Sequence, residues 1–250
     1  STPALKVDGE ASPIQLIEAA KTSVEAAPSF KVETNGQFAK IVNEQFTLAN
    51  LHYYIDKMSE VIIDNEVPFC ELDAHAGDGD FGMSVAKGFK QLKREWAELT
   101  HATSMSAFLS SCSMIIMEHC GGASGPIWGS AFRAAGNAVE GKEFLTVSDF
   151  AAMLQAAVKG IQTTGERSFG RGAVVGDKTL IDAFIPCADV WCDAANGGGT
   201  FADSFTRGAK AAVQGAEATK EIVARMGRAG TVGERSLGYP DAGAHGLGVI

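Results

Sequence analysis

The sequence predicts an all-α protein, and three observations support this. Apolar residues recur at three- and four-residue spacing through most of the chain after residue 37, which gives each helix one buried face. Alanine is abundant in the same segments, and it favours helix and permits close contact between helices. No stretch of convincing length alternates apolar and polar residues, as a half-buried strand would.

The chain is expected to divide into an arm and a helical domain. Residues 1–36 hold Pro3, Pro13 and Pro28 among small polar residues, with one helix-like stretch over 14–26. This composition is typical of a linker or an appended arm. The helical domain is therefore assigned to residues 37–250.

The expected helices follow one another with glycine-rich connections. The first begins at Phe46, and its period continues through residues 61–63 toward Val67. Ser148-Asp149 has suitable N-cap chemistry for a later helix. Glycines concentrate between the helices, so several loops need unusual backbone angles or a close approach, which predicts a shared ligand site at one end of the bundle. The remaining helices are expected over residues 83–99, 106–119, 125–139, 148–163, 179–195 and 202–224.

Charge and cysteine content exclude some classes of protein. The net charge of −9 opposes binding to a nucleic-acid backbone. No run approaches the roughly 18 apolar residues of a membrane span, and the first ten residues lack the pattern of a secretory signal. Five scattered cysteines without a Cys-x-x-Cys pair indicate a reducing cytoplasm. His119 and Cys120 are expected to pack at a helix end, since no second ligand pair has zinc spacing.

Three aspartates form the most informative motif. Asp73, Asp78 and Asp80 fall within eight residues, and Gly77 and Gly79 allow the chain to fold back between them. Converging carboxylates repel one another unless a cation lies between them. Mg²⁺ prefers such oxygen ligands, and three carboxylates can hold one ion or share two. A solvated acidic turn that caps the following helix is an equally good interpretation of the spacing alone.

This motif is not an EF-hand loop. When the loop is counted from Asp78, its twelfth position is Phe89, where a bidentate glutamate is required.

A second glycine loop spans residues 121–126, Gly-Gly-Ala-Ser-Gly-Pro, between two expected helices. Backbone N–H groups at a helix start bind phosphate well, and Ser124 adds a hydroxyl. The loop lacks the Gly-Lys-Ser/Thr ending of a Walker A motif, and Pro126 excludes a Gly-x-Ser-x-Gly elbow. Taken alone, this loop is better interpreted as a helix end followed by a helix start.

The last loop, residues 227–246, carries Arg228 and Arg235 among glycines. Arginine suits bidentate contact with phosphate. Arg235 has an alternative partner in its neighbour Glu234. Residues 176–179, Gly-Asp-Lys-Thr, form a further polar helix start.

With these motifs in view, the chain resembles the nucleotide-binding L subunit, or L domain, of dihydroxyacetone kinases. The resemblance covers residues 38–250 and favours the metal interpretation of the aspartates. The matching runs, in the family's order, are residues 72–82 (Leu-Asp-Ala-His-Ala-Gly-Asp-Gly-Asp-Phe-Gly), 121–126, 176–179 and 233–244 (Gly-Glu-Arg-Ser-Leu-Gly-Tyr-Pro-Asp-Ala-Gly-Ala).

The resemblance implies a barrel of eight antiparallel helices with ADP or ATP at one end, held through two Mg²⁺ ions. It implies that Asp73, Asp78 and Asp80 are the metal ligands. Phe81 stands where the family often has histidine, which puts the detailed nucleotide contacts in doubt. The nucleotide contacts implied by position are Gly82, Met83, Ser84, Ala123, Ser124, Gly165, Leu180, Arg228, Asp241, Ala242 and Gly243.

The resemblance also implies a division of labour. This chain would bring the phosphoryl donor, and a separate K subunit or domain would hold the ketone. The nucleotide is either exchangeable ATP or a bound ADP that a phosphotransferase-system protein rephosphorylates, and the arm slightly favours ATP. Two alternatives stay open: a regulatory module that signals nucleotide state, and the nucleotide domain of a fatty-acid-type kinase. The fatty-acid-type kinase ranks lower, because that group usually carries Pro-x-Pro before the corresponding aspartate. In this chain, Asp78 is preceded by Ala74-His-Ala-Gly77.

Overall fold

The computed structural model describes residues 30–227, 230 and 233–250, and over these residues the fold is helical. One antiparallel pair of two-residue strands, too short to produce a visible alternation in the sequence, joins Phe46 to Leu145 and Thr47 to Phe144. The α-helices are α1 (Leu48–Asp64), α2 (Glu66–Ala76), α3 (Phe81–Arg94), α4 (Trp96–Leu99), α5 (Met105–His119), α6 (Ser124–Ala138), α7 (Val147–Phe169), α8 (Ile181–Asn196), α9 (Phe201–Ala218) and α10 (Ala242–Val249), with strands β1 (Phe46–Thr47) and β2 (Phe144–Leu145) and short 3₁₀ turns η1 (Gly36–Ala39), η2 (Thr219–Glu221) and η4 (Gly233–Ser236).

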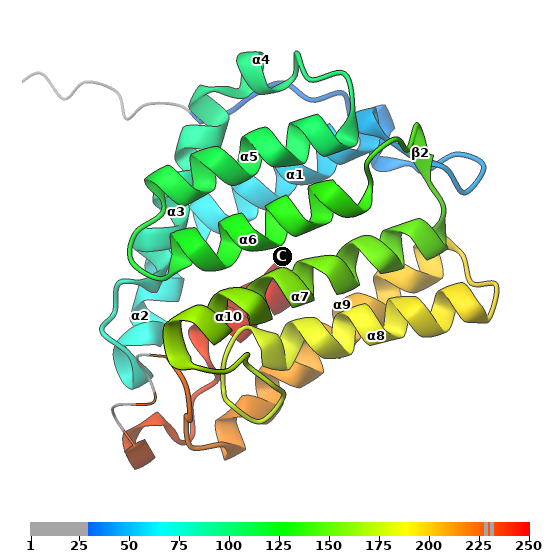
Figure 1. Ribbon diagram of the computed structural model, residues 1–250. Helices are drawn as coiled ribbons and strands as arrows, with labels where there is room; N and C mark the ends of the chain where they lie inside the picture. Colours follow the sequence, from blue (N-terminus) through cyan, green and yellow to red (C-terminus); the bar gives the residue numbers. More distant parts are fainter. Residues whose placement is uncertain (1–29, 228–229, 231–232) are drawn as a thin grey trace, which may run out of the picture.

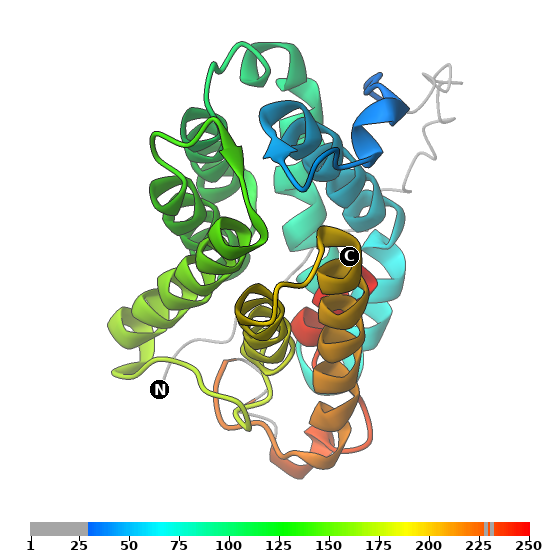
Figure 2. The ribbon, with the colours of Figure 1, turned by 90° about the vertical axis from the view of Figure 1, so that its right-hand side faces the viewer.

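The helices pack side by side into a ring. Each helix from α5 to α9 packs on the next in chain order, and α9 packs on α10. The ring closes because α10 contacts α2, α2 packs on α3, and α3 packs on α5. Figure 2, turned by 90° from Figure 1, shows several of these helices end-on around a shared interior. The all-α fold expected from the sequence is confirmed.

The interior of the ring is a hydrophobic core rich in aromatic rings. Phe150 stacks on Trp191 with ring centroids 4.4 Å apart, and Phe205 meets Trp191 edge-on at 4.9 Å. Phe46 from β1 and Phe201 from α9 join the same cluster. Each such pair contributes about 0.5–1.5 kcal/mol beyond its buried area. The cluster therefore joins α7, α8 and α9 to the strand pair.

The core also surrounds an apolar cavity of about 500 Å³, here called the barrel cavity. Its walls come from α1 and from α5 to α10, and they are almost entirely aliphatic or aromatic. Tyr54 of α1 stacks on Phe205 of α9 across this interior, with centroids 5.1 Å apart. The helices are thus held at their inner faces by apolar contacts.

Several helix ends differ from the sequence-based expectation. The first expected helix breaks at Asn65, so that Asp73 lies on a second helix, α2, and not in a turn. The N-cap of α7 is Thr146, whose hydroxyl accepts the N–H of Asp149 in a reciprocal capping box, and not Ser148. The helix expected to reach 224 ends at Ala218 and is followed by η2. Local side-chain bonds that the apolar period does not encode decide these ends.

The last residues of the expected arm lie against the helical domain. Val32 packs on the core, and the hydroxyl of Thr34 donates to the carboxylate of Asp56 at 2.5 Å. The ring of Phe30 lies 5.0 Å from the guanidinium carbon of Arg94. The division at residue 36 stays a prediction, with residues 30–36 in contact with α1 and α3.

No helix within the described part of the chain combines the length and the apolar character needed to cross a membrane.

Candidate metal centre

The three aspartates converge where α2 turns into α3. Asp73 lies in the last turn of α2, and Asp80 is the N-cap of α3. Oδ2 of Asp73 accepts N–H groups from Gly79 at 2.9 Å, Asp80 at 3.1 Å and Phe81 at 3.3 Å. Gly79 has φ = 77°, a left-handed angle that favours glycine. One carboxylate therefore organises the turn that carries the other two.

The resulting donor set fits a hard divalent cation. One carboxylate oxygen from each of Asp73, Asp78 and Asp80 lies within 4.8 Å of the other two. The set has no thiolate and no imidazole, and all-oxygen sites suit Mg²⁺, Ca²⁺ or Mn²⁺. Asp78 is exposed and the other two are half-buried, so water and phosphate oxygens can complete the coordination shell.

Beside the carboxylates lies a cavity of about 180 Å³, here called the site cavity, at which four helices begin. Asp80 and Phe81 belong to the start of α3, and Ala123 and Ser124 to the start of α6. The starts of α8 and α10 provide Leu180, Asp241 and Gly243. Helix N-termini carry partial positive charge and outward N–H groups. The site cavity is therefore built to receive anionic oxygens next to a cation.

Three of these four helices lack a side-chain cap. No N-cap side chain accepts a hydrogen bond at the start of α3, α6 or α8. At α10, by contrast, the carboxylate of Asp241 accepts the N–H of Ala244 at 2.8 Å. A bound phosphate group at α6 would supply the acceptor that a capping side chain supplies elsewhere.

The electrostatics of the site cavity are dominated by acids. Burial, together with smaller repulsion by Asp182 and Asp73, raises the pKa of Asp241 to about 7 against the opposing effects of the Ala244 N–H and of Lys178. Burial and neighbouring carboxylates therefore both disfavour an uncompensated negative charge at this position. A divalent cation would relieve this repulsion.

The segment before α10 reaches across to the carboxylate turn. Arg235 Nη2 donates to the carbonyl of Gly77 at 3.5 Å, so the alternative pairing with Glu234 is not what the structure shows. The ring of Tyr239 stacks on His75 of α2, with centroids 4.0 Å apart and planes at 3°. The C-terminal loop therefore closes the ring next to the aspartates.

The structure brings together most of the residues that the resemblance implies. Nine of them line the site cavity: Asp73, Asp78, Asp80, Ser84, Ala123, Ser124, Leu180, Asp241 and Gly243. Their assignment as ligands stays a prediction, now with a common location.

Four of the other implied residues are not among those that line the site cavity. Gly82 packs on α2, where an added Cβ would overlap the carbonyl of Glu66. Met83 is exposed, and Gly165 faces Arg171 and Ala173. Ala242 is buried in the first turn of α10. Arg228 lies outside the described residues.

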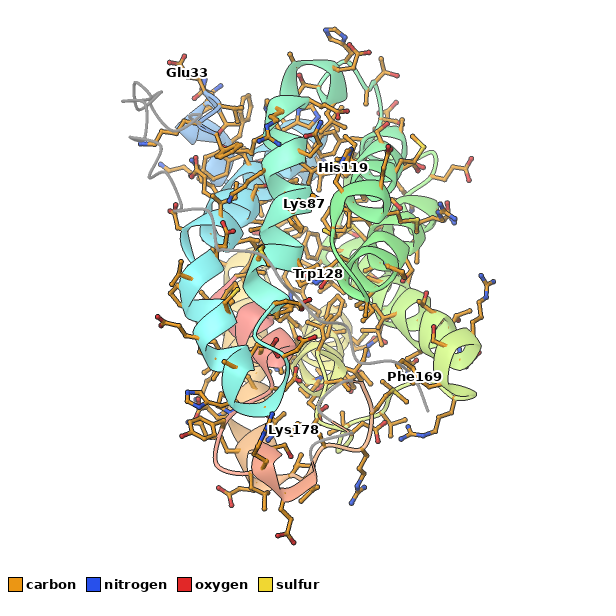
Figure 3. The ribbon with its side chains drawn as sticks, turned by 90° about the vertical axis from the view of Figure 1, so that its left-hand side faces the viewer. Glu33, Lys87, His119, Trp128, Phe169 and Lys178 are labelled. Atoms are coloured by element: carbon orange, nitrogen blue, oxygen red, sulfur yellow. The ribbon has the colours of Figure 1, made fainter. Side chains whose placement is uncertain are left out.

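Sequence reasoning did not single out several residues of the cavity wall. Ile127 and Trp128 directly follow the glycine loop, and Met226 approaches from the C-terminal side. Figure 3 views this side of the molecule, with Trp128 near the middle and Lys178 below it. Their apolar period marks them as ordinary core residues, so only the meeting of the helix starts identifies them. Lys178 and Thr179 lay within a recognised motif but had no assigned role.

The cysteines show no metal chemistry. All five are free. Burial raises the pKa of the Cys120 thiol to about 11, and its Sγ lies 3.5 Å from the carbonyl of Val85. Cys120 is therefore a packed thiol at the end of α5, as expected from the sequence.

The chain is similar in sequence to several known proteins. A family model described as the DAK2 domain matches residues 75–250. The chain is 32% identical over 174 residues to the PEP-dependent dihydroxyacetone kinase 2, ADP-binding subunit DhaL, of Listeria innocua, which covers 69% of this chain and 77% of that protein. It is 31% identical to the L-erythrulose 1-kinase of Mycolicibacterium smegmatis over 78% of this chain, but it spans only 33% of that longer protein.

A solved structure shows the same fold. The dihydroxyacetone kinase of C. freundii in complex with AMP-PNP and Mg²⁺ superposes with a TM-score of 0.56 at 21% identity. The match covers 90% of this chain and 36% of that one.

Proposed function

The chain belongs to the DAK2 domain family, and from this premise we propose that it is the magnesium–nucleotide-binding, phosphoryl-donor component of a kinase for dihydroxyacetone or a related small ketose. The observation that carries the proposal is the meeting of Asp73, Asp78 and Asp80, with oxygens within 4.8 Å of one another, at a cavity where four helices begin. A cluster of acids beside helix N-termini is suited to a metal-bound polyphosphate, because the acids bind the metal and the helix N-termini bind the phosphate oxygens.

Each part of the site has a role in this proposal. Asp73, Asp78 and Asp80 would hold the metal, and their number is enough for two Mg²⁺ ions that share carboxylates. The starts of α6 and α8 would receive phosphate oxygens. The bound metal offsets the negative charge of the transferring phosphoryl group. The chain contributes alignment, since phosphoryl transfer needs the donor, the metal and the acceptor in line.

The ketone acceptor is proposed to arrive on a separate K subunit or domain. No histidine, the residue through which the K partner is expected to hold its ketone, is among the described residues that line the site cavity. The relatives' names give different acceptors, dihydroxyacetone and erythrulose. We therefore assign the choice of acceptor to the partner. The five free cysteines support a reducing compartment such as the cytoplasm.

The experiment that tests this function is nucleotide exchange on the purified chain. Any nucleotide that co-purifies is identified, and labelled ATP is then added with Mg²⁺ or with EDTA. Ready entry of ATP with Mg²⁺ means that ATP is the donor. Co-purified ADP that resists exchange means a phosphoryl carrier that a phosphotransferase protein recharges. Absence of any Mg²⁺-dependent nucleotide binding rejects the proposal.

A second arm separates a kinase component from a regulatory module. Partners are captured with the ADP-loaded chain and with the chain loaded with a non-hydrolysable ATP analogue, and each complex is assayed for phosphorylation of a short ketose. Turnover with a K partner supports the kinase. A partner that changes with the nucleotide, without turnover, supports regulation instead.

A further inference from the structure

Lys178 stands at the start of α8, among the residues that line the site cavity. A lysine beside an anion site would ordinarily be assigned to the anion. Its surroundings indicate otherwise, because the residue is only 1% exposed. A fully buried ammonium is costly unless its donors are satisfied by fixed partners.

All three N–H donors of the ammonium have protein partners. Nζ donates to the carbonyls of Thr219 and Tyr239, each at 2.8 Å, and to the carbonyl of Ser236. A lysine ammonium has three donors and no more. No donor is left for a phosphate oxygen without breaking one of these bonds. Burial lowers the pKa of Lys178, and the nearby Asp241 and Asp182 oppose this shift.

The backbone of Lys178 is itself constrained. Its φ is +61°, in the left-handed region that a residue with a side chain rarely adopts. Such a conformation persists only where surrounding contacts demand it. Here the three carbonyls are the contacts that the side chain can reach from this backbone.

The three carbonyls belong to the described residues of one stretch of chain, 219–227 and 233–241, here called the C-terminal segment. Thr219 is in η2, Ser236 is in η4, and Tyr239 precedes α10. Other bonds tie the same segment: Arg225 N–H donates to the carbonyl of Asp177 at 3.0 Å, and Asp241 N–H donates to Oγ1 of Thr219 at 2.8 Å. Lys178, which is distant in sequence from all three, thus joins the turn at Thr219 to the one that runs from Ser236 to Tyr239.

We propose that Lys178 is a positioning residue: it holds the C-terminal segment against the site cavity and does not itself bind phosphate. The segment provides Met226, Gly227 and Asp241 to the cavity wall and Arg235 to the carboxylate turn. The effect of Lys178 on nucleotide affinity rests on the proposed function, whereas its effect on the position of the C-terminal segment does not.

The first test is hydrogen exchange of the full chain without nucleotide. Lys178→Met keeps the length of the side chain and removes its donors. The amides of Arg225, Gly238 and Asp241 are expected to exchange at least about tenfold faster than in the wild type, while α5 is unchanged. Lys220→Met is the matched control, because Lys220 lies in the same segment but pairs only with Glu217 at the surface. It should exchange as the wild type does.

The second test is Mg²⁺–ADP affinity of the same proteins. The Lys178→Met chain should bind Mg²⁺–ADP about tenfold to a hundredfold more weakly, while hydrogen exchange in α5 stays unchanged. Saturating Mg²⁺–ADP should restore the protection of the C-terminal segment from hydrogen exchange. Weaker binding with wild-type exchange before nucleotide is added would mean that Lys178 contacts the nucleotide, and would overturn the proposal. Faster exchange with unchanged affinity would overturn it as well, since the segment would then be irrelevant to the site.

Two further results would still leave the role of Lys178 testable. If Lys178→Met does not fold, Lys178→Asn replaces it, because asparagine tolerates left-handed backbone and is too short to reach the three carbonyls. If the wild type binds no nucleotide, the proposed function fails, while the exchange experiment alone still decides whether Lys178 positions the segment.

Discussion

The interior of the ring and its polar end are held together by different forces. The barrel cavity is lined mainly by aliphatic and aromatic side chains from seven helices, and its contacts depend chiefly on buried apolar area. The site cavity is bounded by helix starts whose arrangement depends on individual hydrogen bonds, such as the three that Asp73 accepts. The free energy of apolar burial is proportional to the buried area, so small shifts of the side chains change it little. The loss of a single buried hydrogen bond, by contrast, leaves a polar group without a partner and is costly.

This contrast teaches that stability and ligand affinity reside in separate parts of one domain. Substitutions in the aromatic cluster should lower the free energy of unfolding and leave the site geometry intact. Substitutions at the three aspartates or at Lys178 should lower the affinity for Mg²⁺–nucleotide and leave the helices intact.

The largest effect is expected in the aromatic cluster. Trp191 is 2% exposed and touches Phe150, Phe201 and Phe205. Trp191→Ala should lower the free energy of unfolding by about 4 kcal/mol, measured by urea denaturation. The exposed Val213 of α9 is the control, and Val213→Ala should stay within about 0.5 kcal/mol of the wild type. A large loss of Mg²⁺–ADP affinity in folded Trp191→Ala would contradict the separation.

The second prediction concerns the metal ligands. Asp80→Ala should weaken Mg²⁺-dependent nucleotide binding by about a hundredfold or more, near 3 kcal/mol, with helical circular dichroism unchanged. Calorimetric titration with Mg²⁺–ADP measures this loss. Asp64→Ala removes an exposed acid at the end of α1 and should bind as the wild type does. Equal affinities for the two variants would reject the metal assignment.

The third prediction is a pH dependence. Because the pKa of Asp241 is raised to about 7 in the fold, the folded chain binds a proton between pH 4 and 7 that the unfolded chain has released. Its contribution to stability therefore falls as the pH rises through this window. Asp241→Asn keeps an oxygen for the Ala244 N–H and loses the charge.

In metal-free buffer, the stability of Asp241→Asn relative to the wild type should rise by about 2 kcal/mol between pH 5 and pH 8. Thermal unfolding at each pH gives this difference, and titrating groups common to both proteins cancel. A difference that stays constant with pH would show that Asp241 is not protonated near neutrality. Added Mg²⁺ should reduce this pH-dependent difference in stability, because a nearby cation favours the ionised form of Asp241.

The smallest effect is expected where the C-terminal segment meets α2 at the surface. The stacked rings of His75 and Tyr239 are both exposed. Tyr239→Ala should cost no more than about 1 kcal/mol of stability and should change nucleotide affinity by about twofold. Its backbone carbonyl still accepts from Lys178, so the segment stays anchored. A loss as large as that of Lys178→Met would shift the anchoring role to the aromatic stack.

Much of the fold follows from local pattern. The three-to-four-residue period marks the helical segments, because a helix must turn one apolar face inward wherever it packs. The ends were less predictable: Asn65 splits one period into α1 and α2, and Thr146 caps α7 two residues before the expected cap. Single hydrogen bonds decide such ends, and an average over a window does not register them.

The candidate site shows the same limit more sharply. Three aspartates and several glycine loops, with residue types that suit a cation and phosphate, can be identified in the sequence. Which of these loops meet depends on the packing of the helices. This packing places Ser124, Leu180 and Gly243 at one cavity and turns Gly82 toward the backbone of α2. It also brings three backbone carbonyls to the ammonium of Lys178. Convergence of this kind depends on contacts between residues far apart in the chain, and these arise only when the ring closes.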